Sequence, residues 1–152
     1  MEVKIKDLLD IYDQEVRKNV RNKTKLLRFE KNKMMFINKI HEILISGNYD
    51  GGRYNIFLIR DPKYRIVMSQ GIIDKVINHY VTRFILIPKL EKRLDIRNVA
   101  TRKNLGTSYA YKLLNKYLEK YKKYDYFYIL KLDIKKYFYR IDHNILKNLI
   151  KP

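Results

Sequence analysis

The chain contains 152 residues, with 34 Lys and Arg against 16 Asp and Glu, which gives a formal net charge of +18 at pH 7. Its length fits one compact domain, and its 46% hydrophobic residues exclude the composition of a disordered chain. The lack of cysteine excludes disulfides, cysteine-ligated zinc and thiol nucleophiles. The large positive charge favours polyanionic partners, although AT-rich codon usage would also raise the lysine content.

The first part of the sequence predicts helices followed by a hairpin. Apolar residues at helical spacing predict helices over Leu8–Val20 and Lys25–Ser46, and Gly47 ends the second of them. Two β-rich runs, 54–60 and 65–68, flank a turn-forming segment that contains proline, so we expect a β-hairpin.

The middle of the sequence returns to helical spacing. We expect a helix over 72–94 that Pro88 interrupts, and another that Thr107 or Ser108 caps at its N-terminus. The apolar stretch at 84–87 is far shorter than the roughly 20 residues that span a membrane. We therefore expect a soluble, cytoplasmic protein with no membrane partner.

The last part of the sequence combines one strand with one helix. The short run at 126–133, rich in aromatic and branched residues, predicts a buried strand that ends at Asp133. Asp142 is expected to cap a final helix over 143–150. The fold class predicted from all these elements is α+β, with a helix-rich N-terminus.

Asp133 is the carboxylate whose position is most informative. It ends an apolar strand pattern and is surrounded by Lys131, Lys135, Lys136 and Arg140. A carboxylate at a strand end can hold magnesium while neighbouring cations face phosphates. The residues alone are equally compatible with a salt-bridged or capping aspartate, because one carboxylate does not make a metal site.

Basic residues alternate with tyrosines in the C-terminal part, between Tyr109 and Tyr139. Such a pattern suits nucleic acids, because bases stack on rings and cations neutralise phosphates. It also suits a helix and a strand that pack their rings and expose their lysines. From the residues alone, the sequence indicates a basic α+β protein associated with nucleic acid.

Segment 128–143 resembles the first catalytic motif of prokaryotic reverse transcriptases, those of group II introns, diversity-generating retroelements and phage-defence loci. Three upstream segments resemble motifs of the same family in the same order. Residues 63–67 resemble a fingers strand, 74–79 the helix after it, and 98–107 the next fingers motif. The similarity covers about residues 30–152.

The resemblance implies the fingers and the first part of the palm of a right-handed polymerase. Residues 1–50 would form an N-terminal helical extension, 51–124 the fingers and 125–152 the start of the palm. The implied activity is that of an RNA-directed DNA polymerase, a nucleotidyltransferase that uses Mg²⁺. Its implied partners are an RNA template, a DNA or RNA primer, and dNTPs.

The resemblance also assigns roles to individual residues. Asp133 matches the catalytic, metal-binding aspartate, and the backbone carbonyl of Ile134 matches a second magnesium ligand. Lys63 and Arg65 match residues that bind the incoming dNTP, and Phe138 matches the aromatic residue under its sugar. Two-metal phosphoryl transfer needs such carboxylates and cations.

The template-binding residues implied by the resemblance are Arg102, Lys103 and Gly106. The family's second catalytic motif, Tyr-X-Asp-Asp, does not occur, since the sequence contains no Asp-Asp pair. We therefore expect these residues to be the N-terminal fragment of a polymerase and to be inactive alone.

Two other functions stay open at this point. One is a non-catalytic RNA-binding module, such as a maturase-like scaffold, that keeps the fingers fold and the basic surface. The other is a defence-associated polymerase that uses the same scaffold with a DNA template or without a template.

Overall fold

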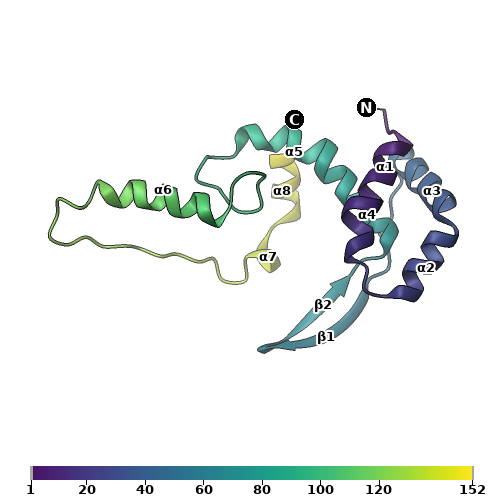
Figure 1. Cartoon of the computed structure of the whole chain (residues 1–152), viewed down its shortest axis with the longest axis horizontal. Coiled ribbons are helices and arrows are strands. Elements are labelled where there is room, and N and C mark those ends of the chain that lie inside the picture. Colours follow the sequence, from purple (N-terminus) through teal and green to yellow (C-terminus); the bar gives the residue numbers. More distant parts are fainter. Residues whose placement is uncertain (1, 152) are drawn as a thin grey trace. The chain divides into compact units, whose positions relative to one another are not determined.

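The computed structural model describes residues 2–151. The chain folds into two compact units, of which the first ends at Pro88 and the second begins at Lys89. Figure 1 shows helices in both units and a two-stranded antiparallel sheet in the first. The predicted α+β class is confirmed. Within the described residues, no helix is long and apolar enough to cross a membrane.

The first predicted N-terminal helix corresponds to a helical stretch that changes type along its length, and the second is divided in two at Asn32. The elements are α1 (Ile5–Ile11), the π-helical η1 (Tyr12–Val16), the 3₁₀ turn η2 (Arg17–Asn19), α2 (Lys23–Lys31) and α3 (Lys33–Ser46). The Asn22 side chain accepts a hydrogen bond from the Lys25 amide at 2.9 Å and so caps α2. Asn32 separates α2 from α3, a break that the sequence did not predict. Gly47 ends α3 as predicted, with a φ of +71°.

The predicted hairpin is confirmed. Strands β1 (Asn55–Asp61) and β2 (Lys63–Ser69) pair antiparallel, with Leu58 opposite Ile66 and Asp61 opposite Lys63. The strands continue into the segment expected to form the turn, so that Pro62 alone stands between them. Figure 1 shows the hairpin extending away from the helices of its unit.

The helical segment after the hairpin changes its hydrogen-bonding pattern along its length. It consists of α4 (Ile72–Tyr80), the π-helical η3 (Val81–Leu86), α5 (Ile87–Leu90) and the 3₁₀ turn η4 (Glu91–Arg93). Pro88 lies within α5, and the π-helical turn precedes it. Because proline has no N–H to donate to the preceding turn, a local change of pattern is expected there. The interruption predicted at Pro88 is therefore present as a change of helix type.

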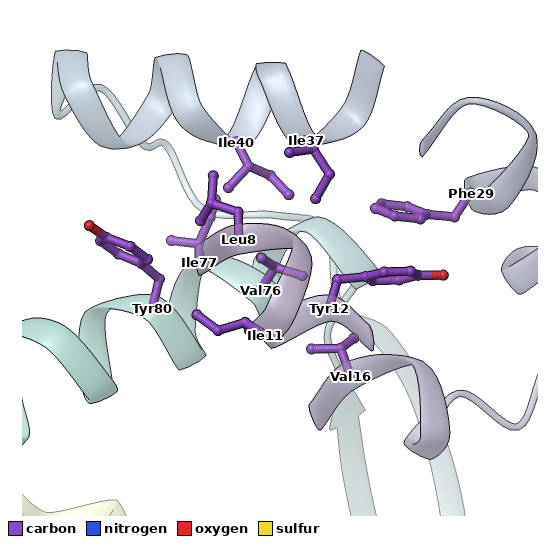
Figure 2. Packing of buried hydrophobic residues seen from close by; sticks show 10 residues of the cluster. All are labelled: Leu8, Ile11, Tyr12, Val16, Phe29, Ile37, Ile40, Val76, Ile77 and Tyr80. Carbon is purple, nitrogen blue, oxygen red and sulfur yellow. The ribbon is translucent and has the colours of Figure 1, made fainter. Parts of the chain in front are cut away.

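A hydrophobic core lies among the helices of the first unit. Figure 2 shows side chains from α1, η1, α2, α3 and α4 pointing toward one another. The rings of Tyr12 and Phe29 stack with centroids 4.6 Å apart, and those of Phe29 and Phe36 with centroids 5.0 Å apart. The buried hydrophobic residues are Leu8, Ile11, Tyr12, Val16, Phe29, Ile37, Ile40, Val76, Ile77 and Tyr80.

The second unit contains α6 (Thr107–Glu119), α7 (Tyr137–Arg140) and α8 (His143–Ile150). The predicted cap of α6 by Thr107 or Ser108 is wrong, because Thr107 is already the first helical residue and Gly106, which has no side chain to cap the helix, stands at the N-cap position. Asp142 caps α8 as predicted, since its Oδ1 accepts the amides of Asn144 at 2.8 Å and Ile145 at 3.1 Å. These two bonds hold the pKa of Asp142 below its usual value.

The prediction of a buried strand over 126–133 is wrong, because these residues are exposed and form no sheet. This segment is extended but pairs with no other strand, and the side chains of Tyr128 and Leu130 are 92% and 81% exposed. A strand is stabilised by a neighbour that accepts its backbone hydrogen bonds, and residues 89–151 contain no such neighbour. The β propensity of the segment is therefore unsatisfied.

Candidate nucleotide and nucleic-acid site

The hairpin presents Lys63 and Arg65 on one face. The two residues are separated by one position along β2, so their side chains leave the strand on the same side. Both are exposed, and within residues 2–151 neither forms an ion pair. Arg65 lies opposite Ile59 in the ladder. Two cations on one accessible face can contact a polyphosphate.

The opposite face of the hairpin is apolar. Leu58 and Ile66 form a cross-strand pair there and are 61% and 67% exposed. Near the tip, the Arg60 guanidinium lies over the Tyr64 ring, 5.5 Å from its centroid. The sheet therefore carries the two predicted nucleotide-binding cations on one face, and on the other face an exposed apolar pair with Arg60 near the tip.

Asp133 and Ile134 lie in the extended segment that precedes α7. Both are exposed, and the described residues contain no group of three or more His, Cys, Asp or Glu side chains that could hold a metal ion. A magnesium ion takes about six oxygen ligands in octahedral geometry. Asp133 and the carbonyl of Ile134 therefore do not by themselves fit a complete magnesium site.

Phe138 is the second residue of α7 and is 83% exposed. Its ring packs edge-to-face against Tyr137, with centroids 5.3 Å apart. Lys136, which precedes α7, has a φ of +54°, so the chain turns sharply between Asp133 and Phe138. No hydrogen bond or ion pair joins this region to Arg102 or Lys103 in the described part of the second unit.

Arg102 is almost fully occupied by contacts within its own unit. Its guanidinium donates two hydrogen bonds to Glu91 Oε1, from Nη2 at 2.8 Å and from Nε at 3.0 Å. Nη1 donates to the backbone carbonyls of Asp95 at 2.9 Å and Asn98 at 3.0 Å. The side chain is only 14% exposed. Arg102 thus holds the segment 91–102 together, a role that the sequence motif did not predict.

Lys103 and Gly106, unlike Arg102, are accessible to a ligand. Lys103 is exposed, and the Gly106 position has no atom within 4 Å of where a Cβ would stand. Asp95 pairs with Arg97, whose Nε lies 2.7 Å from Oδ1, and this contact holds the pKa of Asp95 well below its usual range. Lys103 is the cation of this loop that is available to a phosphate.

A cavity of about 630 Å³ in the first unit was not predicted from the sequence. It lies between α2, α3, the loop before the hairpin and the start of α4. On its wall the Tyr49 hydroxyl donates to Asp74 Oδ1 at 2.7 Å, and the Gly71 amide donates to Oδ2 at 3.2 Å. The sequence signal that could have indicated it is the adjacent pair Gly51 and Gly52, because glycines allow a ligand to approach the backbone closely.

No family model matches the chain. The search of curated proteins also gives no match.

Proposed function

We propose that this chain forms the fingers and the first part of the palm of an RNA-directed DNA polymerase. The observation that carries the proposal is the order of the sequence segments: three fingers-like segments precede the one around Asp133, as in reverse transcriptases. In this assignment, residues 1–50 are an N-terminal helical extension, 51–124 the fingers and 125–152 the start of the palm. The net charge of +18 suits an RNA template and a DNA or RNA primer.

In this function, the hairpin holds the incoming dNTP. Lys63 and Arg65 contact the triphosphate, and their shared exposed face supports this role. An arginine guanidinium and a lysine ammonium both bind phosphate oxygens through charge-assisted hydrogen bonds. Arg60 lies on the other face of the same hairpin and serves as the natural control.

In the palm, Asp133 and the carbonyl of Ile134 would supply part of a magnesium site, and Phe138 would lie under the sugar of the dNTP. When bound, magnesium would neutralise negative charge on the reacting phosphates. Further carboxylates must complete the site, so we expect residues 1–152 alone not to extend a primer. Asp133 is accessible for such completion because its side chain is exposed.

Along the template, Lys103 would contact phosphates directly, and Gly106 would let the strand pass close to the backbone. Arg102 would act as a positioning residue for the same loop, because its donors are engaged by Glu91, Asp95 and Asn98. The proposed fingers include residues from both compact units.

Two matched substitutions in the hairpin test the proposed function. In the product of the complete reading frame, Arg65→Gln should raise the KM for dNTP in primer extension by about tenfold, the loss of one charge-assisted contact. Arg60→Gln removes the same charge from the opposite face and should leave KM within about twofold. Equal effects of the two substitutions would contradict the assignment.

A further inference from the structure

Cations surround the cavity between α2, α3 and the start of α4. The cations that line it are Lys25, Arg28, Lys39 and Arg53, and all four are exposed. Lys25 donates to the Asn55 side chain at 3.2 Å. In the part of the chain that the structure describes, none of the four forms an ion pair. Their charges are therefore available to an anion.

Two carboxylates also line the cavity, and one of them already accepts hydrogen bonds from neighbouring donors. Asp74 is 7% exposed and accepts hydrogen bonds from the Tyr49 hydroxyl and the Gly71 amide at the start of α4. Asp50 is exposed in the loop. Four cations against two carboxylates leave the lining positive, with the excess on the side of α2 and α3.

Aromatic rings provide the apolar part of the wall. Tyr49 is 39% exposed and Phe36 is half-buried, so both present ring surface to the cavity. Phe29 is only 4% exposed and continues the stack of rings into the core toward Tyr12. Nucleobases stack on such rings with little dependence on sequence. The cavity volume lies within the range of roughly 300 to 1,000 Å³ found for small-molecule sites.

The combination of cations and rings points to a ligand with a phosphate and a flat base. We propose that the cavity binds one nucleotide, with its phosphate at Arg28 and Lys39 and its base against Tyr49 and Phe36. The nucleotide is either free or one unit of a single strand, since both present the same chemistry. The site lies outside the residues assigned to polymerisation, so this inference does not depend on the proposed polymerase function.

The glycines of the chain provide a local readout. Gly51, Gly52 and Gly71 line the cavity, whereas Gly47 and Gly106 do not. In the 152-residue chain labelled with ¹⁵N-glycine, uridine 5′-monophosphate should shift the first three amide signals saturably and leave that of Gly106 unchanged. Uridine, which lacks the phosphate, should bind at least about tenfold more weakly because the charge-assisted contacts are lost.

Two pairs of substitutions separate a specific site from general attraction. Arg28→Gln combined with Lys39→Gln removes two charges from the lining, and Lys18→Gln combined with Lys31→Gln removes two charges from exposed positions elsewhere in the same unit. The first pair should weaken binding of the monophosphate about tenfold, and the second less than about twofold. An unchanged signal of Gly47, which lies in the same unit as the substitutions, shows that each ligand-free variant still folds.

A uridine hexanucleotide distinguishes the two sources of the nucleotide. If it shifts the same glycines and binds at least about tenfold more tightly than the monophosphate, the cavity takes a unit of a strand. If the two probes bind equally, it takes a free nucleotide. The proposal is overturned if neither probe gives saturable shifts of the three cavity glycines, or if both pairs of substitutions weaken binding equally.

Discussion

Arg102 and Glu91 are joined by two hydrogen bonds to a single carboxylate oxygen, at 2.8 and 3.0 Å. The same guanidinium also holds two backbone carbonyls, so one side chain ties η4 to the loop before α6. A residue that we expected to bind the template thus has a structural role within its own unit.

Arg102→Ala should destabilise this loop locally. Its removal leaves the Glu91 carboxylate and two carbonyls without their donor, at a cost of about 1–2 kcal/mol for a partly exposed, charge-assisted network. Hydrogen exchange of the Leu105 amide, which donates to the Arg102 carbonyl at 3.2 Å, should become about fivefold to thirtyfold faster. Lys103→Ala is the control and should leave this exchange unchanged; equal acceleration in both variants would refute the structural role of Arg102.

Ionisation of the Tyr49 hydroxyl should lower the stability of the fold at high pH. Burial and the hydrogen bond to Asp74 raise the pKa of Tyr49 to about 12 from its usual value of about 10. Because the folded state favours the neutral hydroxyl, this contribution to stability is complete below about pH 10 and is lost as the pH rises toward about 12. Burial also raises the pKa of Tyr12 and Tyr80, so the measurement must resolve Tyr49 itself.

The titration of Tyr49 can be followed by the ¹³C shift of its ring carbon bonded to oxygen. The wild-type chain should titrate near pH 12, and Asp74→Asn should lower the pKa because it removes the nearby negative charge. A wild-type midpoint at about 10, the unperturbed value, would show that the Tyr49–Asp74 contact does not form.

Position 52 requires glycine because its backbone lies too close to the Asp74 carboxylate to leave space for a side chain. A Cβ at this position would overlap the Asp74 carboxylate, so Gly52→Ala must displace the group that bonds to Tyr49. We expect a loss of about 2–3 kcal/mol in the free energy of unfolding, measured by urea denaturation. Gly51→Ala is the matched control: it has a φ of +77° and no atom within 4 Å, so it should cost only about 1 kcal/mol of backbone strain. An equal or larger loss for Gly51→Ala would contradict the proposed packing.

The apolar face of the hairpin should promote self-association. Leu58 and Ile66 lie opposite each other and are more than half exposed, so replacing both with threonine should reduce light scattering of concentrated protein. Threonine retains β propensity, and unfolding free energy should change by less than about 1 kcal/mol. Replacing Phe57 and Val67 on the other face should have the larger effect on stability, because Val67 is half-buried. Unchanged scattering in the first variant would refute the association.

Local signals in the sequence were sufficient for most helices and for the hairpin. The apolar stripe of α3 and its end at Gly47 both follow from spacing and backbone conformation, and so does the cap at Asp142. The break at Asn32 was missed because an asparagine within a helical pattern does not by itself separate two helices.

Features that need contacts between distant residues could not be predicted in the same way. The run at 126–133 has the composition of a strand, but a strand also requires a partner that its own residues do not specify. The contacts of Arg102 and the cavity beside Asp74 likewise depend on which side chains the fold brings together. The sequence indicated cations and glycines at these positions without indicating what they contact.

Asp133→Asn tests the central claim most directly. The assay is magnesium-dependent extension of a DNA primer on an RNA template by the product of the complete reading frame, together with RNA binding. Asp125→Asn removes another exposed carboxylate from the same part of the chain and serves as the control. We predict that Asp133→Asn abolishes extension while RNA binding is retained, and that Asp125→Asn leaves both unchanged. Extension by Asp133→Asn at the wild-type rate, or no extension by the wild-type protein that still binds RNA, would contradict a polymerase and favour a non-catalytic RNA-binding module.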